Sequence, residues 1–266
     1  GDLMTLATLD MPELRDPPYL APVAAALRDR DDLFAAIRER DILLHHPFES
    51  FGTVVSLIEP AQRHEQTLYV PMELVLGVTA RELFEAARRH KQVLAPSLVA
   101  ALLVSAARGL SAIHRAGLVH GDMSAQTLLI GIDGSARVAY FGMTRSAARA
   151  SALYSDHGVR MSYASPEQMR GDFSDPRSDL FSLAVIGWEL CAGERLFDTP
   201  NPLTTAERVA SLRIPMLDDL RGDVPDALAQ AMAKALERDP EARFDSAERF
   251  AEALGAQVFT YADDGV

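Results

Sequence analysis

The chain has 266 residues, of which 48% are apolar, and its formal charge is −12. This length allows one or two domains with a sizeable core. The charge argues against nucleic acid or an anionic membrane as a partner, because both are held mainly by Lys and Arg. The lone cysteine, Cys191, excludes an internal disulfide framework and is expected to be a small buried apolar side chain. With neither a secretory signal nor a membrane span expected, we predict a cytoplasmic protein.

Residues 1–50 are predicted to form an extended arm followed by one helix. Four prolines between positions 12 and 22 exclude a long helix there. From residue 31 to residue 44 apolar residues recur with helical spacing, and Pro47 ends the pattern.

A resemblance to a known family covers residues 2 to about 59. It is carried by Pro-Glu-Leu-Arg-Asp-Pro-Pro (12–18) and by Ile-Arg-Glu-Arg-Asp-Ile-Leu-Leu-His-His-Pro-Phe-Glu-Ser-Phe (37–51). These runs are similar to the entry to the catalytic region of bacterial polyphosphate kinases. Polyphosphate needs a cationic tunnel, which suits this acidic, lysine-poor chain badly, so polyphosphate is not expected as a ligand.

Residues 51–77 are predicted to hold short strands. Residues 53–58 and 67–70 are rich in β-branched and aromatic side chains, and the polar residues 62–66 are predicted to form a turn between them. Two amphipathic helices are predicted at 78–93 and 96–116. The apolar face of the second helix is expected to consist of Leu98, Leu102, Ala106, Leu110 and Ile113.

Residues 118–142 predict a strand hairpin with a polar cluster in front of it. Two apolar runs flank the turn at Asp133-Gly134, and His120-Gly121-Asp122 precedes them. The stretch resembles the catalytic and magnesium loops of eukaryotic-type protein kinases, which read His-Arg-Asp, four residues, Asn, a hairpin and Asp-Phe-Gly. The resemblance implies an α+β, protein-kinase-like fold with a mainly helical C-lobe and a reduced or atypical N-lobe.

The resemblance also assigns roles in phosphoryl transfer. Asp122 stands where the family has the residue that accepts the substrate proton. Thr127 and Tyr140 stand where the family has the Asn and Asp that hold magnesium. A hydroxyl and a neutral phenol are poor ligands for this ion, so no metal site is predicted. No Gly-x-Gly-x-x-Gly run stands between residue 1 and the predicted helix, and Ala26 matches the position of the family's phosphate-binding Lys.

The residues that would bind the adenine of a nucleotide are expected along Pro71–Gly77. There Met72 matches the gatekeeper, and Glu73 and Val75 match the hinge residues that carry adenine. Leu129 matches the floor of the adenine pocket, and His120 and Phe141 match two members of the apolar spine that joins the lobes. ATP and magnesium are implied by the resemblance, but with the phosphate-binding residues replaced we expect weak or no ATP binding.

The C-terminal part carries two further matching blocks. Tyr163–Gln168 is similar to the Ala-Pro-Glu block, and residues 143–163 occupy the place of the activation segment. Residues 177–190 resemble the central buried helix, where Asp179 accepts hydrogen bonds from the catalytic-loop backbone. Arg243 matches the arginine that pairs with Glu167. The predicted C-lobe covers 78–256, and an acidic tail covers 257–266.

Several functions remain open at this point. The favoured hypothesis is a pseudokinase that acts as a regulatory or scaffolding module through a protein partner. The alternatives are a divergent ATP-dependent Ser/Thr or small-molecule kinase that uses Asp122, a polyphosphate-kinase-related fragment, and a hybrid of two gene fragments without a selected function.

Overall fold

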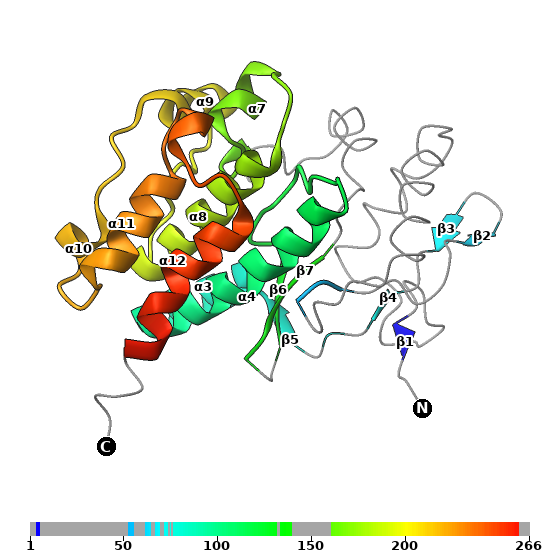
Figure 1. Cartoon of the computed structure of the whole chain (residues 1–266), viewed down its shortest axis with the longest axis horizontal. Helices are drawn as coiled ribbons and strands as arrows, with labels where there is room; N and C mark the ends of the chain where they lie inside the picture. The colour runs from blue at the N-terminus through cyan, green and yellow to red at the C-terminus, as the bar shows by residue number, and fades with distance from the viewer. Residues whose placement is uncertain are drawn as a thin grey trace.

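The computed structural model describes residues 4–5, 53–55, 62–64, 67–69, 72–73, 75, 77–131, 134–139 and 161–260. The helix predicted at 31–44, the activation-segment place up to residue 160, and the candidate residues Tyr140 and Phe141 lie outside these ranges. The described part is mainly helical and carries small sheets (Figure 1). The predicted fold is confirmed in this coarse form, whereas the predicted reduction of the N-lobe stays a prediction.

A three-stranded antiparallel sheet carries the predicted hairpin. Its order is β5 (Gly77–Thr79), β6 (Leu128–Gly131) and β7 (Ala136–Val138), with Leu128 opposite Val138. Gly134 turns the chain with a φ of +78°, which a residue without Cβ adopts easily. Residues 53–55 run parallel beside β7, because the Val55 N–H donates to the Val138 carbonyl and the Val138 N–H donates to the Thr53 carbonyl, each at 2.9 Å.

Two further strand pairs are short. Strand β1 (Met4–Thr5) pairs with β4 (Met72–Glu73), and β2 (Gln62–His64) pairs with β3 (Thr67–Tyr69). The prediction of a turn over 62–66 is therefore wrong for residues 62–64, which form a strand. A strand ladder is made by backbone groups, so a polar run can pair when its neighbour supplies a matching edge.

Helix α3 (Ala80–Arg89) is shorter than predicted at both ends. Residues 78 and 79 belong to β5, and Thr79 caps the helix: its side chain accepts from the Glu82 N–H while the Glu82 carboxylate accepts from the Thr79 N–H. The helix ends before Lys91, whose φ of +52° cannot continue an α-helix.

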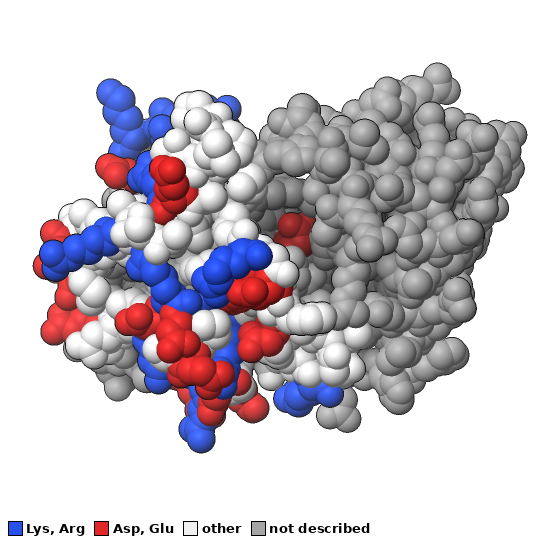
Figure 2. All heavy atoms as spheres, turned by 90° about the horizontal axis from the view of Figure 1, so that it is seen from above, with Lys and Arg blue, Asp and Glu red and all other residues white. Residues whose placement is uncertain are grey.

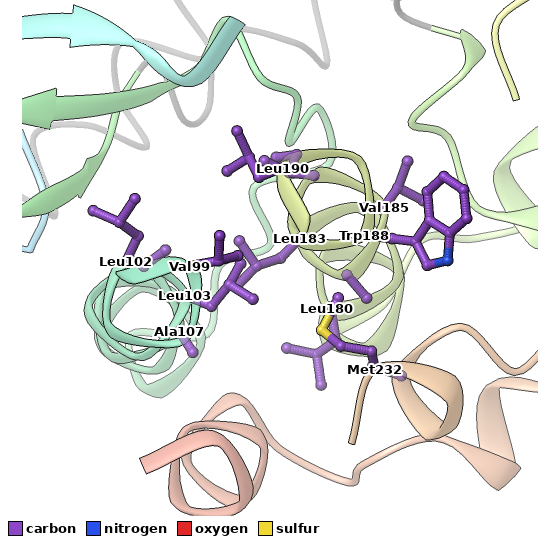
Figure 3. Close-up of a cluster of buried hydrophobic side chains, with 14 of the residues drawn as sticks. Val99, Leu102, Leu103, Ala107, Leu180, Leu183, Val185, Trp188, Leu190 and Met232 are labelled. Atoms are coloured by element: carbon purple, nitrogen blue, oxygen red, sulfur yellow. The ribbon is translucent and has the colours of Figure 1, made fainter. Parts of the chain in front are cut away.

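Helices α4 (Pro96–Arg115) and α8 (Pro176–Ala192) form the centre of the core. Val99 and Leu103 of α4 face Leu180 and Leu183 of α8, and Met232 lies against them (Figure 3). Leu98, predicted on the buried face of α4, is instead 43% exposed, because α8 and α12 cover the faces that carry Val99 and Leu103.

Two predictions about buried apolar segments can be compared with this core. By length and composition α4 could cross a membrane, but 67% of its apolar window is buried inside the fold, as in a core helix. Cys191 on α8 is fully buried, as predicted, and burial raises the pKa of its thiol to about 12.

The remaining helices complete the C-terminal half. They are α7 (Pro166–Arg170), α9 (Pro202–Ser211), α10 (Leu217–Leu220), α11 (Asp226–Ala235), the 3₁₀ turn η3 (Pro240–Ala242) and α12 (Ala247–Thr260). Helix α12 lies along α4 (Figure 1). It ends at Thr260, so residues 257–260 of the predicted acidic tail belong to the helix.

Candidate functional site

The loop 118–127 is held by a buried carboxylate at the start of α8. The backbone N–H groups of His120 and Gly121 each donate to Asp179 at 2.8 Å, and Nε2 of His114 lies 2.8 Å from the same carboxylate. Asp179 is only 1% exposed, so these donors replace the water that its charge would otherwise require. The structure thus brings Asp179 to the backbone where the resemblance placed it. His114 was missed, because nothing in its local sequence indicates a partner 65 residues away.

His120 links this loop to the end of β7. Its Nδ1 accepts from the Asp122 N–H at 3.2 Å, and its Nε2 lies 3.0 Å from the Ala139 carbonyl. These contacts select the neutral tautomer with the proton on Nε2. His120 is 1% exposed, so it acts as a buried connector between the loop and the residue before Tyr140.

Thr127 uses its hydroxyl to close the loop on itself. Its Oγ1 accepts from the Ser124 N–H at 2.9 Å and lies 3.1 Å from the Ser124 carbonyl and 3.3 Å from that of Asp122. A hydroxyl has one proton and two lone pairs, so these backbone contacts use most of its capacity. Thr127 is also 6% exposed.

A magnesium ion fits this loop poorly. Within residues 118–127 Asp122 is the only carboxylate, and no group of three or more His, Cys, Asp or Glu side chains that could hold a metal occurs among the described residues. Magnesium prefers octahedral oxygen ligands that include carboxylates, and the Thr127 hydroxyl already faces its own backbone. Asp122 itself is half-buried, and its role as a proton acceptor stays a prediction.

The residues expected on the nucleotide-binding side belong to two different sheets and to the segment after β4. Met72 and Glu73 form β4, Val75 follows it, and all three side chains are half-buried. Leu129 of β6 is half-buried and lies between Thr79 and Arg137 in the sheet. The Arg137 guanidinium donates to the Glu73 carboxylate at 2.5 Å, which fastens this segment to the hairpin.

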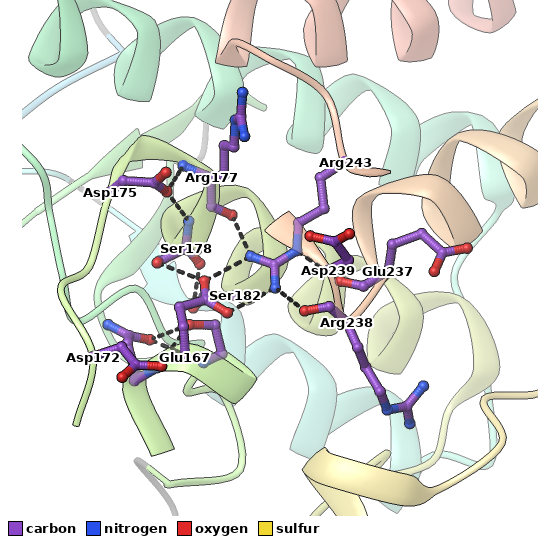
Figure 4. Close-up of polar contacts among 12 residues, drawn as sticks. Glu167, Asp172, Asp175, Arg177, Ser178, Ser182, Glu237, Arg238, Asp239 and Arg243 are labelled. Atoms are coloured by element: carbon purple, nitrogen blue, oxygen red, sulfur yellow. Dashed lines mark hydrogen bonds and ion pairs between the residues drawn. The ribbon is translucent and has the colours of Figure 1, made fainter. Parts of the chain in front are cut away.

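Glu167 and Arg243 form a bidentate ion pair between α7 and the residue after η3 (Figure 4). The two N–O distances are 2.7 and 2.8 Å, and the Ser178 hydroxyl donates to Glu167 at 2.7 Å. Burial alone would raise the pKa of Glu167, but hydrogen bonds from Arg243 and Ser178 outweigh it and lower the pKa to about 2.

The Arg243 guanidinium also reaches three backbone carbonyls. It donates to the carbonyls of Arg177, Glu237 and Arg238 at 2.7–3.1 Å, and its side chain is fully buried. The structure therefore brings together the two residues that the resemblance paired, within a network that spans three elements.

A second buried network was not predicted. The Tyr163 hydroxyl donates to Glu189 at 2.9 Å, Arg195 donates to Tyr163 Oη at 2.6 Å, and the Leu196 N–H donates to Glu189 at 3.1 Å. Burial raises the pKa of Glu189 to about 7, although the Arg195 charge and the Leu196 N–H lower it. This network fastens the segment before α7 to α8. The sequence offered no signal for it, because Arg195 lies in a connection without periodicity.

Known proteins with similar sequences point to one family. A family model described as protein kinase domain matches residues 25–255. The chain is 34% identical over 201 residues to the serine/threonine-protein kinase PknL of Mycobacterium tuberculosis. This alignment covers 74% of this chain and 47% of PknL. It is 31% identical over 182 residues to the serine/threonine-protein kinase PknB of Mycobacterium leprae (67% and 28%), and 33% identical over 168 residues to the tyrosine-protein kinase MasK of Myxococcus xanthus (59% and 26%).

Two consequences follow from these matches. The chain spans less than half the length of each of these relatives. The family match begins at residue 25, so it includes much of the stretch 2–59 that was compared with polyphosphate kinases. That second resemblance gains no support from the comparisons.

Proposed function

Since this chain belongs to the protein kinase family, we propose that it is a member with impaired phosphoryl transfer that acts as a regulatory or scaffolding module for a protein partner. The observation that carries the proposal is Thr127, whose hydroxyl bonds to the backbone of its own loop where the family uses a metal ligand. Tyr140, in the place of the second ligand, carries a phenol, whose ordinary pKa is about 10.

The size of the expected loss follows from how kinases work. Phosphoryl transfer depends on positioning and on charge stabilisation by metal ions, the strand Lys and the loop residues. If each missing group is worth about 100-fold, or about 2.7 kcal/mol, two of them leave little turnover, although such effects are not additive. The framework around Asp179, Glu167 and Arg243 does not depend on these groups. A folded binding module is therefore compatible with lost catalysis.

The test measures nucleotide binding and transfer separately. The melting temperature of the protein is recorded with ATP, with and without magnesium, and phosphate transfer to a generic protein substrate is followed in parallel. We expect no magnesium-dependent stabilisation and no transfer. A magnesium-dependent rise of several degrees accompanied by transfer that Asp122→Asn abolishes would refute the proposal.

A second candidate function is an active Ser/Thr-type kinase. It is favoured by the names of the relatives and by Asp122, which matches the family's proton acceptor in the sequence and whose N–H donates to His120. In that case Asp122→Asn should abolish transfer while the melting temperature stays unchanged. The same variant has no effect on partner binding if the first proposal holds.

A further inference from the structure

A cluster of basic side chains covers the end of α3. It consists of Arg88, Arg89, His90 and Lys91, here called the basic patch, and all four are exposed. Within the part of the chain that the structure describes, the side chains of Arg88, Arg89 and Lys91 form neither an ion pair nor a hydrogen bond. Arg88 stacks on the Phe84 ring, with its guanidinium carbon 5.6 Å from the ring centroid. Val93, two residues after the patch, is 54% exposed.

Lys91 has a left-handed backbone conformation, which residues other than glycine rarely adopt. Its φ is +52°, and the other residues with positive φ in the described part are all glycines. Its N–H donates to the Arg88 carbonyl, as in a helix end that usually carries glycine. The chain has two lysines in total, and one of them stands at this position. A positively charged side chain therefore occupies a position where glycine would adopt the backbone conformation at lower cost.

The arginines of the basic patch differ in their contacts from most other arginines in the described part of the chain. Arg177, Arg221 and Arg243, for example, pair with carboxylates, and the last two also donate to backbone carbonyls. Basic and acidic side chains are interspersed over the face shown in Figure 2. Cations in the last turn of a helix complement its dipole, which explains Arg88 and Arg89 in part but not Lys91 beyond the helix end. Glu85 is one turn away from Arg88 and Arg89 on α3, yet it forms no recorded pair with them.

We propose that the basic patch docks an acidic segment of a protein partner, with Val93 as an apolar contact beside it. This inference rests on the proposed function, which requires such a partner. The local positive charge acts over about one Debye length, roughly 8–10 Å, so the net charge of −12 does not cancel it for a short segment. That net charge does repel a long polyanion. Four side chains at one helix end are also fewer than the phosphate contacts that hold a nucleic acid.

The test uses a labelled peptide that carries a run of glutamates next to one leucine, followed by fluorescence anisotropy. The affected variant is Arg88→Glu/Arg89→Glu/Lys91→Glu. The control is Arg108→Glu/Arg115→Glu/Arg213→Glu, which makes the same change in net charge at exposed positions outside the patch. We expect the first variant to bind the peptide roughly tenfold or more weakly and the control to bind like the unmodified protein.

Lys91→Gly separates binding from folding. It removes a charge and relieves the backbone, so the melting temperature should stay equal or rise while peptide affinity falls. Equal affinity in the patch variant and the control would overturn the inference. Tighter binding to a single-stranded DNA oligonucleotide or to phosphatidylserine vesicles than to the peptide would also overturn it. Failure of the proposed function would appear separately, as magnesium-dependent transfer, which this assay does not measure.

Discussion

The framework around Glu167 and Arg243 and the loop around Thr127 treat their polar groups differently. In the framework, each buried charge meets partners from two or three elements: Arg243 reaches one carboxylate and three carbonyls, and Asp179 accepts three donors. In the loop, a neutral hydroxyl bonds to the backbone within five residues of itself. The difference teaches that buried charges in this fold are satisfied by partners from distant segments, whereas a neutral hydroxyl is satisfied within its own loop.

The largest expected effect separates the framework from the surface. Arg243→Ala leaves the buried Glu167 charge and three carbonyls without their partner, so we expect a loss of about 3–5 kcal/mol in the free energy of unfolding. Urea denaturation measures it. The control is Arg249→Ala, which breaks an exposed pair with Glu252 and should cost about 0.5 kcal/mol or less. Equal costs for both variants would show that the framework pair carries no special weight.

The second effect is pH dependence. Because the folded-state pKa of Glu189 is raised from 4.5 to about 7, its contribution to stability is complete below pH 4.5 and is lost as the pH rises towards 7. The loss can reach about 3 kcal/mol. Glu167 acts in the opposite direction: its pKa is lowered to about 2, so its contribution is present above pH 4.5 and is lost as the pH falls towards 2.

Glu189→Gln isolates the first of these two contributions. It removes the titration while keeping a similar shape, so the stability of the variant should vary less between pH 4.5 and 7 than that of the unmodified protein. Thermal denaturation across that range measures the slope. Identical slopes in the two proteins would show that Glu189 does not titrate there.

A smaller effect tests the contact between α4 and Asp179. His114→Ala removes one of three donors to a buried carboxylate, at an expected cost of about 1–3 kcal/mol. The lower end of this range is expected because Nδ1 of His114 is buried without a hydrogen-bond partner. The cost of burying that atom already offsets part of the stabilisation that the bond to Asp179 provides. His114→Gln, which keeps a donor, should recover part of the loss in urea denaturation. No loss in His114→Ala would mean that His120 and Gly121 alone satisfy Asp179.

The smallest effect concerns the loop. Thr127→Val leaves the Ser124 N–H without its acceptor, for which we expect about 1 kcal/mol of destabilisation and no change in the response to ATP and magnesium. Thr127→Asn/Tyr140→Asp is the matched opposite, because it restores both metal-ligand types and should introduce magnesium-dependent stabilisation by ATP. A drop in phosphate transfer caused by Thr127→Val would contradict the contrast between the two regions.

The sequence by itself determined the family, the hairpin and the buried helix α8. The hairpin has a local signal, an Asp-Gly turn between apolar runs. The family and helix α8 are indicated by motif blocks at the spacing of the family, among them residues 177–190. The pairing of Glu167 with Arg243 was also available, though only through the resemblance, since 76 residues separate the two.

Only the tertiary structure decided the contacts between distant segments. The donor from His114, the network of Tyr163 with Glu189 and Arg195, and the exposure of Leu98 all depend on which helix faces are covered. The strand at 62–64 likewise depends on a neighbouring edge. Periodicity reports which face of an element is apolar, but a hydrogen bond or a covered face requires a partner, and the partner's position is set by the packing of the whole chain.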